Sequence, residues 1–292
     1  MRSLQQSLEA RPQPGHGNFY IPEELTALYY APIYNTLSLD QRTRYNQLFG
    51  LFLNEFVLLC ELHFSKAYLS LLKAPHLSEA RKAEIRRFLQ DEERHTRLFT
   101  SLNQEAAPEL YVDSGFYFIE LPWLLHIVAG GMMRFPKLFP FFFVLVYLQE
   151  EKLLYYAERY AACAENVDAR FLAAHATHLE DEKGHIGLDL SVVAELWQRA
   201  SQPVKRLNGW LLQTIFREFF TAPKRSGMRI LERLIAEFPE LTQQREELRT
   251  QLSAAGMSQG FLDQMYSEHS VPGSLRFFDT HPELRSLTQV GR

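Results

Sequence analysis

The spacing of apolar and polar positions follows the period of a helix along almost the whole chain. Apolar residues recur three and four positions apart, and no stretch of useful length alternates with the period of two that marks a strand. Leu48 to Leu62 is apolar on nearly every face, which is typical of a helix at the centre of a bundle. The pattern predicts an all-α protein whose four main helices cover about Gln41 to Leu72, Glu79 to Gln104, Phe139 to Ala164 and Asp168 to Ala200.

The lengths of the connections between these helices predict their arrangement. Short turns at Ala74 to Ser78 and near Asn166 make two hairpins, whereas the connection from Ala107 to Lys137 is long and contains an apolar piece of its own, Trp123 to Met133. Two hairpins joined by one long crossover match the ferritin-like form of the four-helix bundle. We therefore expect a flexible N-terminal arm over residues 1–18, a ferritin-like bundle over 19–200 and a helical extension over 201–292.

The predicted extension contains apolar helical faces but no pattern of metal-binding residues. We expect it to pack on the bundle, cap the site or form a homodimer surface. Its helices are predicted at about Leu207 to Phe220, Gly227 to Phe238, Leu241 to Ala255 and Gln259 to Tyr266, followed by a tail.

Charge, apolar runs and cysteine spacing limit the cellular locations and the kinds of partner that we expect for the protein. The net charge of −4 carries no basic excess, so we expect neither a nucleic-acid nor a membrane partner, and a small molecule fits better. The apolar run Leu138 to Leu148 is too short to span a bilayer. Cys60 and Cys163 stand far apart without a CxxC pattern, and the N-terminus lacks the apolar core of a signal peptide, so a cytoplasmic location is predicted.

Two Glu-x-x-His steps carry the candidate chemistry. Glu92 with His95 and Glu182 with His185 each place a carboxylate and an imidazole on one helix face. A chain of this composition is expected to contain about one Glu-x-x-His step by chance, so a single step does not indicate a metal site. His178 precedes Glu182 by four residues and extends the second step into a stripe that also includes Asp189. Four metal-competent side chains on one face indicate a metal site.

Facing residues of an antiparallel hairpin are equally far from its turn, which selects the remaining ligands. The midpoint of Glu151 and Glu182 falls at the turn near Asn166, and Glu150 fits almost as well. Glu151 is preferred because it shares a stripe with Tyr155 and Glu158. In the first hairpin the midpoint of Glu61 and Glu92 falls within the turn, whereas that of Glu55 and Glu92 falls just before it. Glu61 is therefore preferred, with Glu55 and Glu150 as fallback ligands.

The resulting ligand set unites both hairpins. Mixed imidazole and carboxylate ligation without thiolates suits two iron ions, with manganese possible and zinc able to compete. Asp91, Asp181, Asp189 and Tyr155 are candidates for supporting the ligands. The predicted ligands are Glu61, Glu92, His95, Glu151, His178, Glu182 and His185.

These motifs resemble those of a known family. The order Glu92-x-x-His95, Glu151 and His178-x-x-x-Glu182-x-x-His185 is similar to that of the di-iron arylamine N-oxygenases, the relatives of p-aminobenzoate N-oxygenase, and the run from Asp181 to Ile186 resembles the same family. Ferritins, bacterial desaturases and the ribonucleotide reductase small subunit lack a third histidine in this place, whereas the N-oxygenases have it. The likeness covers about Phe19 to Trp197, and the interval from Glu61 to the first motif is slightly shorter than the family's.

The resemblance implies an enzyme of secondary metabolism. A di-iron centre would activate O2 and oxidise the nitrogen of a small amine, aryl amine or amino acid, to hydroxylamine, nitroso or nitro products. It further implies an external electron donor and a substrate that is free or tethered to a carrier protein. Three alternatives share the same residues or fold: a di-iron hydroxylase or desaturase acting at carbon, a non-catalytic iron-binding protein, and an all-helical scaffold without metal.

Overall fold

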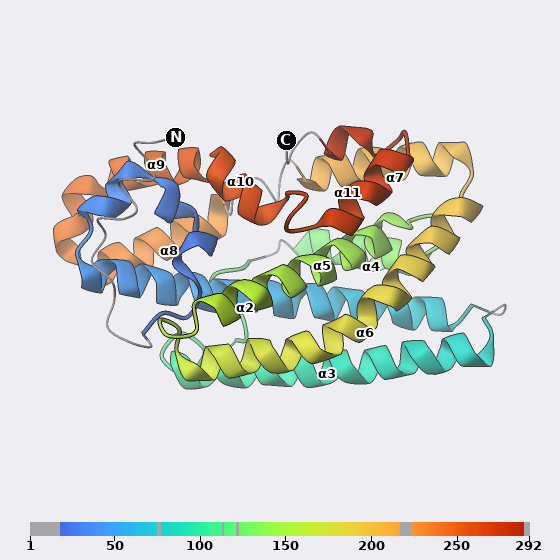
Figure 1. Ribbon diagram of the computed structural model, residues 1–292, viewed down its shortest axis with the longest axis horizontal. Helices are drawn as coiled ribbons and strands as arrows, with labels where there is room; N and C mark the ends of the chain where they lie inside the picture. The colour runs from blue at the N-terminus through green and yellow to red at the C-terminus, as the bar shows by residue number, and fades with distance from the viewer. Residues whose placement is uncertain (1–17, 75–76, 113, 121–122, 217–223, 289–292) are drawn as a thin grey trace.

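The computed structural model describes residues 18–74, 77–112, 114–120, 123–216 and 224–288, which form helices and connecting segments (Figure 1). The described residues contain no strand, and a single isolated bridge joins Phe19 to Val167. The predicted all-α class is confirmed. The predicted arm lies outside the described residues except for Asn18.

Four long helices form the bundle. Helices α2 (Leu39–Leu72) and α3 (Glu79–Ala106) make one hairpin, and α5 (Phe141–Ala162) and α6 (Ala169–Arg199) make the other. The hairpins meet through contacts of α3 with α6 and of α2 with α5. The long connection between them contains α4 (Trp123–Met133), which packs against α2. This is the predicted ferritin-like arrangement with a crossover.

Helix α2 runs through the middle of the molecule and has a well-defined start. The Ser38 hydroxyl accepts from the Gln41 amide at 3.2 Å while the Gln41 side chain accepts from the Ser38 amide at 2.9 Å, which makes a capping box. By length and composition α2 could cross a bilayer, but 61% of its apolar window is buried within the protein. Core helices pass the same test, so this is weak evidence for a membrane span.

The crossover is anchored by a buried carboxylate. Glu55 accepts hydrogen bonds from the backbone amides of 117–119 at 2.8 to 3.1 Å and from the Tyr111 hydroxyl at 2.8 Å. Burial raises the pKa of Glu55, although these hydrogen bonds partly offset that effect. The fallback ligand Glu55 is therefore engaged by the crossover.

The C-terminal helices pack on the bundle on the side away from α3 (Figure 1). Helix α8 lies on α2, where the Arg44 guanidinium holds Glu237 at 2.6 Å. The prediction missed α11, which was expected to be tail, and started α7 five residues late. The extension comprises α7 (Gln202–Ile215), α8 (Lys224–Glu237), α9 (Arg245–Ala255), α10 (Gln259–Met265) and α11 (Pro272–Thr280).

The N-terminal segment packs along the same helices as short 3-10 turns. These are η1 (Glu23–Leu25), η2 (Ala27–Tyr30) and η3 (Pro32–Thr36), while η5 (Pro239–Gln244) and η6 (Arg285–Leu287) lie in the extension. The side chain of Asn46 on α2 holds this segment by binding the backbone of Tyr20 and Ile21 at 2.6 to 3.2 Å.

Candidate metal centre

Buried carboxylates and imidazoles from all four bundle helices converge in two adjacent groups. Glu61, His95 and His178 make one group. The second group consists of Glu92, Glu150, Glu182 and His185. Within each group the candidate ligand atoms lie within 4.8 Å of one another, and every member is buried. Six of the seven predicted ligands thus come together, with Glu150 in place of Glu151.

The first group brings two imidazole nitrogens to one side of the Glu182 carboxylate. His178 Nε2 lies 3.0 Å from Glu61 Oε1 and 2.8 Å from Glu182 Oε1. His95 Nδ1 lies 3.4 Å from the same Glu182 oxygen. The third histidine therefore belongs to the centre, where it adds a second imidazole to the group that contains Glu61.

Glu182 and Glu92 lie between the two groups. The second Glu182 oxygen, Oε2, is 3.2 Å from His185 Nδ1, so the two oxygens of one carboxylate face different groups. Glu92 Oε1 lies 3.6 Å from His185 Nδ1 and 3.8 Å from His95 Nδ1. Both carboxylates are placed to bridge two ions, as the glutamates of paired Glu-x-x-His motifs do in such bundles.

The donor atoms fit a pair of divalent cations. Within the described part of the chain, no hydrogen-bond partner is found for Glu61 Oε2, either oxygen of Glu92, Glu150 Oε2 or His95 Nδ1. Buried polar atoms without partners are costly, and metal ions would satisfy them. The four carboxylates of the two groups together balance the charge of two divalent ions.

Burial and mutual proximity shift the ionisation of these groups. Burial, together with the neighbouring carboxylates, raises the pKa of Glu61 and Glu92 well above 4.5. Burial and the other imidazoles hold the pKa of His178 well below 6.5. A neutral imidazole is the form that ligates a metal.

Each Glu-x-x-His step is preceded by an aspartate that supports the histidine of the opposite helix. Asp181 on α6 accepts from His95 Nε2 at 3.0 Å, and Asp91 on α3 accepts from His185 Nε2 at 3.3 Å. These bonds leave Nδ1 of each ring facing the carboxylates. Arg94 spans both aspartates, at 2.5 Å from Asp91 and 2.9 Å from Asp181. Asp91 and Asp181 therefore lie where supporting residues were predicted.

Asp189 makes a separate buried contact at one end of the centre. Its Oδ1 accepts from the Tyr68 hydroxyl, and burial raises the Asp189 pKa to about 7. Tyr68 packs on Phe88, whose ring lies 4.6 Å from that of His185. Phe99 covers the other side, 5.1 Å from the His178 ring. Aromatic side chains therefore border the ligands and keep the surroundings apolar.

Two of the predicted site residues lie elsewhere. The Glu151 carboxylate turns away from the bundle interior and accepts from the backbone amides of Gly273 at 2.5 Å and Ser274 at 2.8 Å, at the start of α11. Tyr155, one turn further, donates its hydroxyl to Gln264. Their stripe faces the C-terminal helices, so the preference for Glu151 over Glu150 is corrected, and Tyr155 does not support a ligand.

The sequence reasoning also missed two residues of the centre. Arg94 could have been found, because it lies three residues after Asp91 and within the first Glu-x-x-His step. Tyr68 follows Glu61 by seven residues, just as Asp189 follows Glu182, so equal steps along α2 and α6 bring the pair together. That relation becomes visible only when both helices are placed in one bundle.

A ferritin-like bundle whose interior unites two Glu-x-x-His steps around two groups of ligands defines a dinuclear metalloprotein of the carboxylate-bridged class. Comparison with known families narrows the class. The family described as P-aminobenzoate N-oxygenase AurF matches residues 8–267, so the chain belongs to this family. Its members are non-haem di-iron N-oxygenases, and the chain is an enzyme of that kind. No curated protein and no solved structure matches the chain.

Proposed function

We propose that the protein holds two iron ions at this centre and uses O2 to oxidise the nitrogen of a small aromatic amine, p-aminobenzoate or a close relative. The observation that carries the proposal is the position of Glu182, whose two oxygens face separate imidazole groups at 2.8 Å and 3.2 Å. Such a carboxylate is suited to bridging two ions. Family membership supports the amine nitrogen as the atom that is oxidised.

The protein residues would divide the ligation between two positions. Glu61, His95 and His178 would hold one ion, and Glu150 with His185 would hold the other, with Glu92 and Glu182 shared. Bound iron would supply the redox chemistry with O2. Asp181 and Asp91 would fix the histidine tautomers by accepting the Nε2 protons, which leaves Nδ1 as the ligating atom.

The apolar surround would protect the reaction. Phe88 and Phe99 would exclude water from the two ends of the ligand set. The first oxidation consumes the amine, O2, two electrons and two protons, and yields the hydroxylamine and water. The electrons come from an external donor. Further rounds give the nitroso and nitro products, and the substrate is free or tethered to a carrier protein.

Metal content and product analysis test this function. Iron-reconstituted protein should contain two irons per chain and, with reductant and O2, convert p-aminobenzoate to products with oxygen on nitrogen, identified by mass spectrometry. A His178→Ala, Glu182→Ala double variant should lose iron and activity. Glu180→Ala, at an exposed position on the same helix, should retain both.

Three results would contradict the proposal in different ways. Products hydroxylated on carbon would indicate a hydroxylase of the same fold. Iron uptake far above two per chain without turnover would indicate an iron-handling protein. Activity with manganese but not iron would correct the metal while leaving the ligand set in place.

A further inference from the structure

The acidic residues of the chain are unevenly distributed. The protein has 35 Asp and Glu residues against 31 Lys and Arg, yet residues 121–149 and 199–216 contain no acidic residue. The first segment contains Arg134 and Lys137, and the second contains Arg199, Lys205 and Arg206. A net charge of −4, which predicted no anionic partner, therefore conceals two locally basic segments.

These two segments also display large apolar side chains to solvent. On α4 and the turn after it, Trp123 is 73% exposed, Ile127 60%, Phe135 57% and Leu138 50%. On α7, Trp210 is 61% exposed and Leu207 44%. Single exposed apolar residues are ordinary, but a group of this size marks a contact surface. Two of the three tryptophans of the chain belong to it.

The structure joins the two segments into one surface. The Asn208 side chain on α7 donates to the Leu138 carbonyl at 2.9 Å and accepts from the Phe141 amide at 3.1 Å. The residue that follows Leu207 therefore holds the backbone of Leu138. Trp123 and Ile127 lie one turn apart on α4, and Phe135 and Leu138 lie in the segment that connects α4 to α5. We call this set, with its basic residues, the α4–α7 face.

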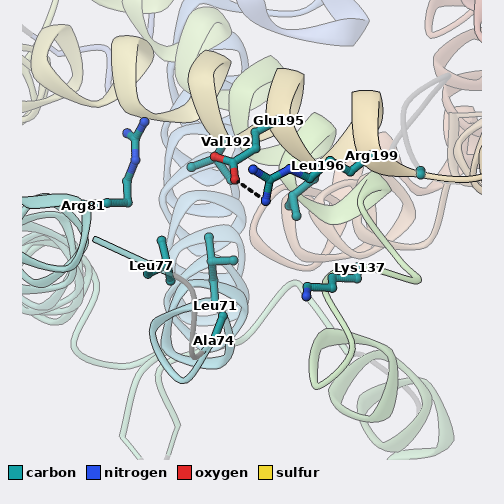
Figure 2. A pocket seen from close by; sticks show the side chains of 10 residues that line it. Leu71, Ala74, Leu77, Arg81, Lys137, Val192, Glu195, Leu196 and Arg199 are labelled. Atoms are coloured by element: carbon teal, nitrogen blue, oxygen red, sulfur yellow. Dashed lines mark ion pairs between the residues drawn. The ribbon is translucent and has the colours of Figure 1, made fainter. Parts of the chain in front are cut away.

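A cavity beside this face has matching chemistry (Figure 2). Its volume is about 300 Å³, and Leu71, Leu77, Val192 and Leu196 give it an apolar floor. Lys137 and Arg199 lie on its rim, where Arg199 is paired with Glu195 at 2.9 Å. Among the residues that the structure describes, no carboxylate forms an ion pair with Arg134, Lys137, Lys205 or Arg206.

We infer that the α4–α7 face docks the protein on the surface of an anionic lipid bilayer. Tryptophan and other apolar side chains enter the boundary between headgroups and acyl chains, while lysine and arginine remain with the phosphates. At 11 residues α4 is too short to span a bilayer and would lie in its surface. A second copy fits less well, because a two-fold interface brings the same unpaired cations together.

Vesicle sedimentation of the full-length protein tests this inference. The protein should sediment with vesicles of phosphatidylglycerol and phosphatidylcholine, and much less with phosphatidylcholine alone. Lys137→Glu with Arg206→Glu should weaken binding at least tenfold, because each lost basic residue costs about fivefold and reversal adds repulsion. Trp123→Ser with Ile127→Ser should weaken binding to the same vesicles through loss of inserted apolar area.

Matched controls separate docking from general charge or folding effects. Arg86→Glu with Arg87→Glu reverses two exposed cations on α3, and Met257→Ser removes an exposed apolar residue elsewhere. Both should sediment like the parent, and circular dichroism should show that all variants are folded. The inference is overturned if anionic vesicles do not bind, or if the α3 variant loses binding equally. It is also overturned if Trp123→Ser with Ile127→Ser only converts a dimer to a monomer. None of these three results bears on the metal centre.

Discussion

The His95 ring on α3 is oriented by Asp181 on α6, with His95 Nε2 and Asp181 Oδ2 3.0 Å apart. We expect Asp181→Ala to lower iron affinity about 10- to 100-fold, because the ring loses the acceptor that fixes its tautomer and direction. Equilibrium titration with ferrous iron measures the effect. Glu180→Ala, which removes the preceding exposed carboxylate, should bind like the parent. Equal affinity in both variants would refute the positioning role.

Substitution of the neighbouring carboxylates Glu150 and Glu151 on α5 should have different effects on iron binding. Glu150→Ala should reduce bound iron below two per chain, because Glu150 is the residue of the pair that lies among the ligands. Iron measured after gel filtration decides the matter. Full iron content in Glu150→Ala together with loss of iron in Glu151→Ala would restore the assignment made from the sequence.

Glu151→Ala should act on stability instead. The substitution removes the acceptor of the Gly273 and Ser274 amides and should lower the free energy of unfolding by about 1–3 kcal/mol. Denaturant unfolding of the iron-loaded protein gives this value. Glu158→Ala, at an exposed position on the same stripe, serves as the control and should change stability little.

The contact of α8 with α2 should depend on pH. Partial burial opposes ionisation of Glu237, but Arg44 and Arg233 outweigh it and hold the Glu237 pKa below its ordinary value of 4.5. The ion pair therefore stabilises the fold fully above pH 4.5, and this contribution is lost as the pH falls through the lower folded-state pKa.

At neutral pH, Glu237→Gln should lower the free energy of unfolding by about 1 kcal/mol, a value discounted for solvent screening. The difference from the parent should shrink below pH 4.5. Unfolding curves at several pH values measure it. A difference that stays constant down to strongly acidic pH would show that the pair does not contribute through charge.

Two helical glycines should respond in opposite directions to the same substitution. A Cβ on Gly50 would lie 2.5 Å from the Tyr20 Cβ, so Gly50→Ala should push the N-terminal segment outward and cost about 1–3 kcal/mol of stability. A Cβ on Gly187 meets nothing within 4 Å, so Gly187→Ala should gain about 0.5–1 kcal/mol. Thermal unfolding compares the two, and equal signs would contradict the packing at Tyr20.

Much of the fold and most of the candidate site follow from the sequence because helical period and turn length are local properties. The Glu92 and Glu182 motifs needed only the spacing of a helix. Choosing between Glu150 and Glu151 needed the rotation of α5, and adjacent residues on a helix differ by about 100° at nearly the same height.

That rotation is set by partners far along the chain. The stripe of Glu151, Tyr155 and Glu158 resembled a ligand face, but Glu151 binds the start of α11 and Tyr155 binds α10, while Glu158 is exposed. Because α11 itself was not predicted, its hydrogen bonds to Glu151 could not be taken into account when the ligand was chosen. Val146, a fully buried apolar residue one turn before Glu150, was the available signal for the inward face.

The order of the gathered ligands along the chain has a consequence for synthesis on the ribosome. The first hairpin emerges with Glu61, Glu92 and His95, and the last ligand, His185, follows 90 positions after His95. The carboxylates of Glu61 and Glu92 are thus synthesised before the ligands of the second hairpin, with which they would bind metal ions. Domains fold from the N-terminus as they emerge, but this centre can close only when the second hairpin is complete. The proposed ligand set would therefore bind its metal ions only after the second hairpin has been synthesised and folded.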